Sequence, residues 1–394
     1  MNKTYDAVVI GAGAVGTNVA YQLCRRGLSV ALLDKKDVAG GSSSRCSASI
    51  LICDKTPGEE TRLGYASMME TKKIQEECSE SFEFKQKGSL YVCETEEELA
   101  EASSYVKKQQ ADGYDMRMVT PAEMREMEPY LARDLLGGIW TTPDATVNPY
   151  ALCFSIANEC RRMGAEVIGH CTVTGMKYDE NGAVAGVITD QGEILTKTVI
   201  NCGGVWARQL GHMAGVDLPI VPRKGLMLVS ERTFPISHQL VHEFGYMLSK
   251  YEDIDFTRNV SERVERNNVA FEMEQMEAGN FIMGGHRAFV GLDFKSDIEV
   301  MQAVAERGIR FFPIIKEINC IRSYCGVRPW TEDHIPYICG LDNVPGYYIA
   351  AGHEGDGIAL SGITGVLMAQ LIFGETPDFD MEQFGLNRGK KAQA

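Results

Sequence analysis

Two continuous apolar runs lie near the start of the chain, and a glycine-rich turn followed by a helical stretch separates them. Residues 8–10 carry no polar interruption, which is typical of a strand buried on both faces. A helical stretch follows and is expected to end at Gly27, before a second apolar run over residues 30–33. Residues 5–34 are therefore predicted to form a strand, a helix and a second strand in succession.

Helical periodicity with many charged positions dominates residues 56–112. At residues 95–98, and again at 120–123, a threonine is followed three positions later by a glutamate, which is the capping-box signature of a helix start. In the second case a proline also occupies the first helical position. A further helix is expected over residues 148–164, where a glycine ends it.

After this helix the pattern changes to short strands. They are predicted over residues 172–178, 183–189 and 194–200, with turns at an Asn-Gly and a Gln-Gly dipeptide between them. Residues 225–325 mix strand and helix signals without a repeat, and we place most of a second, substrate-covering domain there.

The C-terminal part returns to signals like those of the N-terminus. An apolar strand at residues 347–351 leads into a glycine cluster at 352–357 and an apolar helix to about Phe373, a kind of helix normally buried in a core. A chain of 394 residues is long for one core. Because no low-complexity linker separates its parts, we expect two domains that are discontinuous in sequence.

Charge narrows the classes of partner. The 39 basic and 54 acidic side chains give a formal net charge of −15, which disfavours binding to nucleic acid or to an anionic membrane. The only basic cluster is Arg388, Lys390 and Lys391, which we interpret as a solvated tail.

Twelve cysteines are scattered through apolar stretches without a single C-x-x-C pair. Structural zinc and iron–sulfur clusters usually need closer pairing, so buried free thiols in a reducing cytoplasm are the favoured interpretation over disulfides. No stretch approaches 18 apolar residues, so no transmembrane helix is predicted. The expected location is cytoplasmic, and peripheral attachment to a membrane is compatible with it.

Gly11, Gly13 and Gly16 form a G-x-G-x-x-G turn between the first strand and the first helix, and Asp34 follows at the usual distance. Such a turn places a pyrophosphate at the helix N-terminus, and the carboxylate can accept hydrogen bonds from ribose hydroxyls. Because a carboxylate disfavours a 2′-phosphate, the turn indicates FAD or NAD rather than NADP, although the cations Lys35 and Lys36 keep NADP open as an alternative. A glycine-rich turn without a ligand is the alternative.

Five further segments make the whole chain similar to the FAD-dependent D-amino acid oxidase superfamily, which includes glycine oxidase, sarcosine oxidase and D-amino acid dehydrogenases. They are the serine-rich loop 40–48, the strand start 171–173, the strand-glycine segment 199–206, the G-x-R-P-x-T-x-D pattern at 326–333 and the loop 352–359. The residue sequence of the last segment most resembles that of β-type subunits of bacterial proline, hydroxyproline and opine dehydrogenases. That resemblance implies iron–sulfur or FAD-containing partner subunits.

The resemblance implies an α/β and α+β fold, in which a Rossmann-like FAD-binding domain is interleaved with a substrate domain on a mixed or antiparallel sheet. We assign residues 1–85, 145–224 and 326–380 to the first domain, 86–144 and 225–325 to the second, and 381–394 to a tail.

The resemblance also implies a set of site residues. The catalytic candidates are Arg328, His353, Tyr246 and His286, and further substrate contacts could come from Lys250, Arg287 and Tyr324. The candidates for FAD binding are Gly11, Gly13, Ala14, Val15, Gly16, Asp34, Lys35, Ser42, Ser43, Ser44, Arg45, Ser47, Val173, Cys202, Gly203, Trp206, Gly326, Arg328, Gly355, Asp356, Gly357 and Ile358.

In the implied reaction a small amino or imino acid is oxidised at its C–N bond. Arg328 holds the substrate carboxylate bidentately, and the neutral amine expels a hydride from the adjacent carbon to flavin N5. Sarcosine, glycine, proline, hydroxyproline, a D-amino acid and an opine all fit. Two departures from relatives matter, because Gly355 stands where glycine oxidases carry a second arginine, and Cys325 is out of register for covalent flavin attachment. Non-covalent FAD is therefore expected.

Three alternatives stay open at this point. An oxidase would pass the electrons to O₂, whereas a dehydrogenase subunit, which we favour, would pass them to a partner or a quinone. A nicotinamide-dependent dehydrogenase could use the same glycine turn. A non-catalytic subunit could bind FAD for electron transfer alone.

Overall fold

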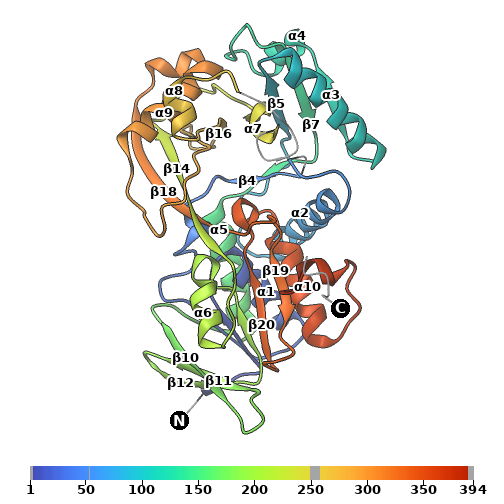
Figure 1. Ribbon diagram of the computed structural model, residues 1–394, viewed down its shortest axis with the longest axis vertical. Helices are drawn as coiled ribbons and strands as arrows, with labels where there is room; N and C mark the ends of the chain where they lie inside the picture. Colours follow the sequence, from blue (N-terminus) through green and yellow to red (C-terminus); the bar gives the residue numbers. More distant parts are fainter. Residues whose placement is uncertain (1–2, 53, 249–257, 389–394) are drawn as a thin grey trace.

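The structure is a computed structural model that describes residues 3–52, 54–248 and 258–388. Its elements form two regions along the long axis (Figure 1). The lower region in that view contains the N-terminal strands and α1, and the upper region contains α3, α4, α8 and α9. Candidate residue Lys250 lies outside the described residues.

A six-stranded sheet forms the centre of the lower region. Its strands follow the order β19-β20-β13-β2-β3-β9, and all neighbours are parallel except β19 and β20. The strands are β2 (Ala7–Ile10), β3 (Val30–Leu33), β9 (Glu166–Ile168), β13 (Val199–Asn201), β19 (Tyr337–Gly340) and β20 (Tyr347–Ala351). The predicted first βαβ unit and the predicted strand at 347–351 are confirmed, and the parallel order of the sheet agrees with the expected Rossmann-like fold.

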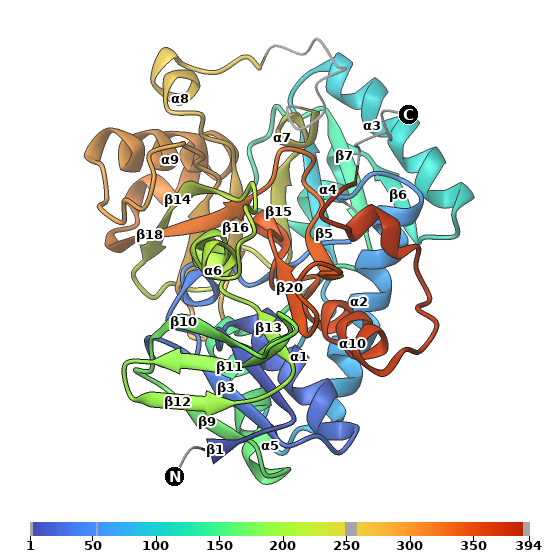
Figure 2. The same cartoon turned by 60° about the horizontal axis from the view of Figure 1, so that its bottom comes forward.

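The two faces of this sheet are covered differently. The helices α1 (Ala14–Arg25), α5 (Pro149–Arg162) and α10 (Ser361–Phe373) share an apolar core with Ala7 and Val9. Val8 and Ile10 face the opposite side, where α6 (Ala207–Met213) and a second sheet pack. That sheet has the order β1-β12-β11-β10 and lies across the first in Figure 2. Its strands are β1 (Lys3–Thr4), β10 (Val173–Tyr178), β11 (Val184–Thr189) and β12 (Gly192–Leu195).

One predicted strand, over residues 194–200, is wrong because the chain changes sheets there. It divides into β12 and β13, which belong to different sheets. The Thr196 hydroxyl donates to the carbonyls of Asp6 and Thr198 at 3.1 and 3.2 Å, and this turn separates the two strands. Apolar residues on both sides hide such a break from periodicity alone.

An eight-stranded mixed sheet forms the centre of the upper region, in the order β18-β14-β17-β16-β15-β5-β7-β6. Only β15 and β5 run parallel. The strands are β5 (Ser89–Cys93), β6 (Met116–Val119), β7 (Gly137–Thr141), β14 (Val221–Ser230), β15 (Leu240–Glu243), β16 (Glu272–Gln275), β17 (Phe281–Gly284) and β18 (Cys320–Trp330). A small antiparallel pair is formed by β4 (Ser49–Ile50) and β8 (Ala145–Thr146).

Helices and short 3-10 turns complete the chain. They are α2 (Glu59–Glu77), α3 (Glu96–Ala111), α4 (Pro121–Met127), α7 (Phe244–Leu248), α8 (Glu262–Arg266), α9 (Ile298–Phe311), η1 (Ser42–Ser44), η2 (Gly204–Trp206), η3 (Pro313–Glu317), η4 (Glu354–Asp356) and η5 (Met381–Phe384). The predicted helical region 56–112 is interrupted by β5, whose five residues are all buried in the sheet. The capping box at 120–123 is complete, whereas Glu98 caps the backbone N–H of Glu94 rather than that of Thr95.

The C-terminal segment is packed rather than solvated, contrary to expectation for Arg388. Its guanidinium group pairs with both oxygens of Asp333, at 2.6 and 2.9 Å, and lies 3.7 Å from the ring centroid of Tyr337. Phe384 is only 1% exposed. A bidentate partner and an aromatic face make this arginine part of the fold, whereas Lys390 and Lys391 lie outside the described residues.

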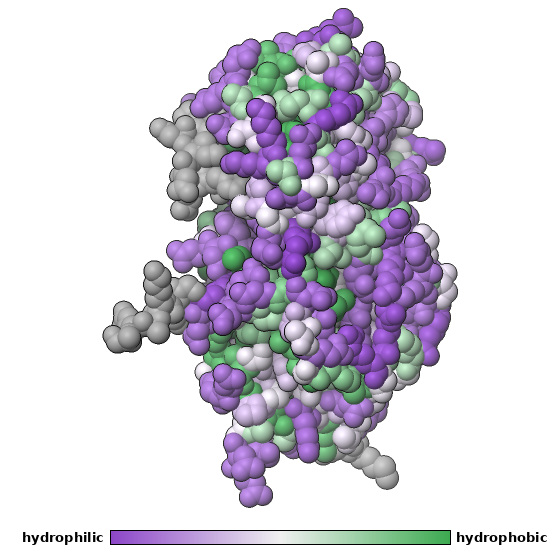
Figure 3. Space-filling model, turned by 90° about the vertical axis from the view of Figure 1, so that its right-hand side faces the viewer, coloured by the Kyte–Doolittle hydropathy of each residue, from purple (hydrophilic) through white to green (hydrophobic). Residues whose placement is uncertain are grey.

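The face shown in Figure 3 is largely hydrophilic, with scattered apolar areas. Among the described residues no helix is long and apolar enough to cross a membrane, and no cluster of side chains could hold a metal ion. The eleven described cysteines are free thiols, and seven of them are buried as expected, whereas Cys320 is exposed.

A buried carboxyl group gives the first testable prediction. Burial, with repulsion from Glu94 and Glu243, raises the pKa of Glu98 from 4.5 to about 7. The folded state therefore binds this proton more tightly than the unfolded chain, so ionisation of Glu98 costs stability as the pH rises from about 4.5 to about 7. Replacement Glu98→Gln should raise the melting temperature by a few degrees at pH 8 relative to wild type, and by less at pH 5.

Thermal unfolding of both proteins at the two pH values checks this. Exposed Glu97, changed to Gln, is the control and should show no gain that grows with pH. An equal gain for Glu98→Gln at both pH values would contradict the prediction.

Candidate active site

A single elongated pocket runs from the glycine turn of the lower region to the sheet of the upper region. It is lined at one end by the N-terminus of α1 and by β10, and at the other by β14, β15, β16 and β18. The predicted residues on its wall are Gly11, Gly13, Ala14, Val15, Asp34, Lys35, Ser42, Ser43, Arg45, Ser47, Val173, Cys202, Gly203, Trp206, Tyr246, Gly326, Arg328, His353, Gly355, Asp356, Gly357 and Ile358. Segments far apart in sequence thus meet in one site.

The glycine turn has no room for side chains. A Cβ atom on Gly11 would lie 2.3 Å from the carbonyl oxygen of Cys202, and Gly11 has φ +109°. A Cβ on Gly13 would lie 2.9 Å from the Ser43 hydroxyl oxygen. Gly16 does not line the pocket. Its Cα faces the carbonyl of Gly11, and the absence of a side chain there lets the helix pack closely against the strand.

The N-terminus of α1 is open to an anion. Its N-cap residue is Gly13, which has no side chain to cap the helix, and its first turn contains no acidic residue. Ala14 N–H donates to the Ser43 hydroxyl at 3.0 Å, which brings the serine-rich loop onto the helix start. Backbone N–H groups and the helix dipole at such a terminus favour a phosphate.

Asp34 is fixed at the end of β3 by the backbone. One carboxylate oxygen accepts from Ala12 N–H and the other from Lys36 N–H, both at 2.8 Å. Each oxygen keeps a second lone pair for a ligand hydroxyl. The neighbouring Lys35 ammonium lies 3.4 Å from the ring centroid of Trp206, and burial followed by repulsion from Lys36 lowers the pKa of Lys35.

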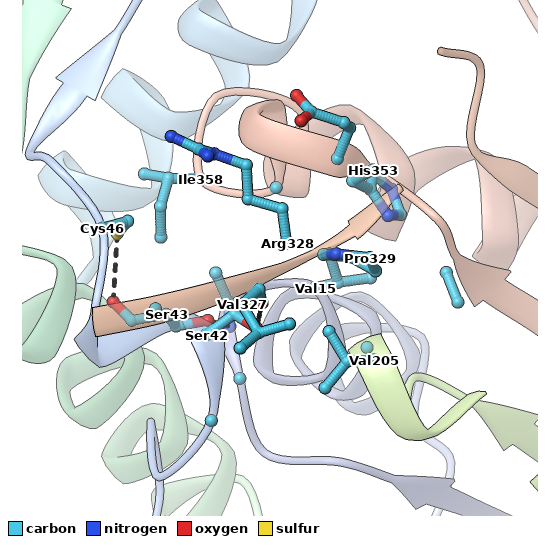
Figure 4. Close-up of a pocket in the computed structure, with 18 of the residues that line it drawn as sticks. Val15, Ser42, Ser43, Cys46, Val205, Val327, Arg328, Pro329, His353 and Ile358 are labelled. Carbon is cyan, nitrogen blue, oxygen red and sulfur yellow. Dashed lines mark hydrogen bonds between the residues drawn. The ribbon is translucent and has the colours of Figure 1, made fainter. Parts of the chain in front are cut away.

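Arg328 projects from β18 into the space between the Ser42–Ser44 segment and the loop that carries His353 and Ile358 (Figure 4). Its Nη1 donates to the carbonyl of His286 at 3.0 Å. Burial acts to lower the pKa of Arg328, but attraction to Glu354 and Tyr246 outweighs it and raises that pKa. The guanidinium group is therefore a permanent cation in the wall of the pocket.

Gly225, on the neighbouring strand β14, makes room for this guanidinium group. A Cβ atom there would lie 2.9 Å from Nη1 and 3.1 Å from Cζ of Arg328. Gly225 pairs in register with Gly326, where a Cβ would lie 2.2 Å from the Arg45 carbonyl oxygen. The two facing glycines thus let the serine-rich loop and the arginine pack against the two strands.

Glu354 balances part of the positive charge near Arg328. Its carboxylate lies 2.5 Å from Nη2 of Arg223, which pairs in register with Arg328. Burial acts to raise the pKa of Glu354, but attraction from Arg328 and Arg223 lowers it. Glu354 has φ +49°, an uncommon left-handed conformation that turns this side chain toward the arginines.

His353 is a neutral hydrogen-bonding group. It is 3% exposed, and burial lowers its pKa to about 3. The Thr364 hydroxyl donates to the carbonyl of Leu360 at 2.8 Å, so it must accept the 2.9 Å hydrogen bond from His353 Nε2. This assigns the tautomer with the proton on Nε2.

Several predicted contacts lie behind the pocket wall rather than on it. Ser44 donates to the carbonyl of Gly41, and the His286 ring is buried, with its backbone carbonyl supporting Arg328. Burial, with repulsion from Arg328, lowers the pKa of His286 to about 4. Arg287 stacks on Tyr246 at 3.6 Å from the ring centroid and donates to its hydroxyl, so it supports a wall residue. Tyr324 donates to the carbonyl of Cys46.

A row of polar residues on the upper sheet was not predicted. Tyr91, His242 and Glu272 pair in register across β5, β15 and β16, and all three line the pocket. The rings of Tyr91 and His242 stack at 5.1 Å. The alternation of side chains along one strand shows which residues share a face of the sheet. It does not show how three strands align with one another, so a single sequence does not reveal this row.

Comparison with known proteins agrees with this geometry. Mitochondrial sarcosine dehydrogenase of Homo sapiens is 27% identical over 403 residues, covering 98% of this chain and 41% of that protein. The chain thus spans about two fifths of the length of that relative. Glycine oxidase of Geobacillus kaustophilus is 26% identical, with 98% of both chains covered. Hydrogen cyanide synthase subunit HcnC of Pseudomonas aeruginosa is 26% identical, with 98% and 96% covered.

Solved structures share the whole fold. L-proline dehydrogenase from P. horikoshii superposes with a TM-score of 0.86 at 26% identity, and 98% of each chain is covered. Glycine oxidase from Geobacillus kaustophilus gives a TM-score of 0.87 at 24% identity, with 98% of this chain and 99% of that one covered. The family of FAD dependent oxidoreductases named DAO matches residues 6–371. The glycine cradle, the open helix terminus and this match together show that the chain belongs to the DAO family of FAD-dependent oxidoreductases.

Proposed function

We propose that this protein oxidises the C–N bond of a small amino or imino acid, with Arg328 holding the substrate carboxylate. The observation that carries the proposal is the position of that guanidinium group, in the same pocket as the glycine turn and the loop 352–358. A planar guanidinium binds a carboxylate through two parallel hydrogen bonds and cannot lose its charge. One Nη1 hydrogen is used on His286, which leaves the other donors for a ligand.

The residues of the pocket fit FAD along its length. Gly11, Gly13 and the start of α1 would hold the pyrophosphate, Asp34 the ribose, and the loop 352–358 the isoalloxazine end. Bound FAD would accept the hydride that leaves the substrate carbon. The Cys325 thiol supports non-covalent binding, because it is directed to the carbonyl of Lys295 while Gly326 faces the pocket.

The pocket residues would act mainly by positioning. Arg328 would fix the carboxylate end, and the Tyr91–His242–Glu272 row would bound the side chain or the nitrogen substituent. Holding a substrate in reactive geometry supplies a large part of catalysis, so no dedicated general base is needed. Neutral His353 cannot act as an acid near pH 7, because its pKa is about 3.

Electron transfer to a partner or a quinone, rather than to O₂, is the favoured second half of the reaction. Relatives named as dehydrogenases and as a synthase subunit support it. An O₂-using oxidase is the alternative, supported by the relative named glycine oxidase.

The proposal also includes a division of the chain into two domains. The FAD-binding domain comprises residues 1–85, 145–224 and 326–380, and the substrate domain comprises 86–144 and 225–325.

An anaerobic screen tests the function. Purified holoprotein is mixed with sarcosine, glycine, proline, hydroxyproline, D-alanine and an opine, and the flavin absorbance is followed. At least one compound should bleach it. A yellow protein that none of them bleaches would contradict the proposed substrate class. Admission of air then separates the acceptors, since fast reoxidation with stoichiometric peroxide would identify an oxidase.

Gly225 gives a second prediction. Replacement Gly225→Ala should displace the Arg328 guanidinium group, because the new methyl carbon would lie 2.9 Å from Nη1. A shift of this size at a substrate clamp is expected to raise KM by about tenfold or more, with FAD content unchanged. Gly175→Ala on β10 is the matched control, since its Cβ would meet only ordinary contacts at 3.5 Å or more. An unchanged KM in the first variant would show that Arg328 does not bind substrate.

A further inference from the structure

Lys55 is a fully buried cation beside the pocket. Its side chain is 1% exposed, and it lies in the segment between β4 and α2. Lysine is almost never buried to this extent unless it is paired, because removing an ammonium group from water is costly. A specific partner is therefore expected.

Two carboxylates surround the Lys55 ammonium group. Its Nζ lies 2.6 Å from Oδ1 of Asp54 and 2.7 Å from Oδ1 of Asp356. Both aspartates line the pocket, and Asp356 belongs to η4 in the loop 352–358. Burial acts to lower the pKa of Lys55, but attraction to Asp356 and Asp54 outweighs it and raises that pKa well above its ordinary value. The three groups, here called the Lys55 triad, thus consist of one cation and two anions.

The backbone of Lys55 is anchored to the upper region. Its carbonyl accepts from the Tyr105 hydroxyl at 2.7 Å and from Gln109 Nε2 at 3.2 Å, and both donors lie on α3. At the other end, Asp356 N–H donates to the carbonyl of His353 at 2.9 Å. The triad therefore connects α3 to the loop that closes the pocket and fixes where its charges lie.

We propose that Lys55 is a positioning residue that holds Asp54 and Asp356 at the isoalloxazine end of the pocket and, with them, sets the reduction potential of the bound FAD. The inference rests on the proposed placement of that ring beside the loop 352–358. Reduction adds negative charge to the ring. A nearby ammonium group favours that change and a nearby carboxylate opposes it, and both effects are stronger in a buried site because the effective dielectric constant there is lower.

Opposite signs make the test specific. In holoprotein, Lys55→Met removes the cation and should lower the midpoint potential, whereas Asp356→Asn removes an anion and should raise it. Sulfite, an anionic probe that adds to the flavin and leaves it negatively charged, should bind about tenfold more weakly to the first variant and about tenfold more tightly to the second. For a two-electron couple, a tenfold change corresponds to about 30 mV.

Controls separate charge from packing. Lys73→Met changes an exposed lysine that pairs with Glu70 at 3.8 Å and should alter neither value. The double variant should return toward wild type. Shifts of the same sign in both single variants, or no shift beyond that of Lys73→Met, would overturn the inference. If Lys55→Met fails to retain FAD, Asp54→Asn replaces it, and both aspartate variants must then raise the potential.

The outcome is independent of the substrate assignment. Amino-acid bleaching is measured on the same preparations, so a wild-type protein that no amino acid reduces would defeat the proposed function. The sulfite and potential measurements would still decide the role of the Lys55 triad.

Discussion

Replacing Arg328 with alanine should give a yellow protein whose flavin amino acids reduce far more slowly than in the wild type. The variant leaves the substrate carboxylate without its cation in a buried site, and removing one partner of such a pair costs about 2 to 5 kcal/mol. That cost corresponds to a loss of kcat/KM of roughly 30-fold to 4,000-fold. Anaerobic stopped-flow reduction, followed across a range of substrate concentrations, measures it.

Two variants serve as controls for this result. One changes another arginine on the same strand, and the other keeps a positive charge at position 328. Arg322→Ala changes an exposed arginine on β18 and should leave reduction unchanged. Arg328→Lys keeps the charge but not the planar fork, so it should recover only part of the rate. Full activity in Arg328→Ala would remove the basis of the proposed function, whereas loss of FAD would point to a structural role instead.

A second large effect is expected from Gly11→Ala. The residue has φ +109°, and its new Cβ would lie 2.3 Å from the carbonyl oxygen of Cys202, a backbone atom that cannot rotate away. Strain of about 1 to 3 kcal/mol for the backbone conformation adds to this collision. We expect the turn to open and the FAD content to fall to about a tenth of wild type or less.

Absorbance ratios of the purified proteins measure the flavin content. The matched control is Gly64→Ala on α2, where the added Cβ would meet only ordinary contacts at 3.8 and 3.9 Å. It should keep its FAD. A Gly11→Ala protein with full FAD content would show that the glycine turn does not carry the pyrophosphate.

The sequence predicted best those parts of the site that depend on local chemistry. The glycine turn is confirmed as strand, turn and helix because positive φ and close packing demand glycine whatever surrounds it. Arg328 was identifiable because a recognisable pattern of residues flanks it. These signals lie within a few residues of each other, so one sequence is enough to read them.

Features that depend on strand register were missed. Gly225 and Arg223 belong to the environment of Arg328 only because β14 and β18 align in one way. Glu354 lies in the loop 352–359, which the sequence indicated, but its pairing with Arg223 depends on the tertiary fold. Arg388 was read as solvated because its partner, Asp333, lies 55 positions earlier in the chain.

The strands β14 and β18 have a consequence for how a substrate enters. Their pairing keeps one register from Val221 opposite Trp330 to Val229 opposite Arg322, and Arg328 lies within this stretch. Such a ribbon resists bending, so hinge motion of the two regions at this junction would have to break an antiparallel ladder. Admission of substrate and escape of product should therefore depend on rearrangement of smaller peripheral segments, while the anchoring cation stays at a constant distance from the redox centre.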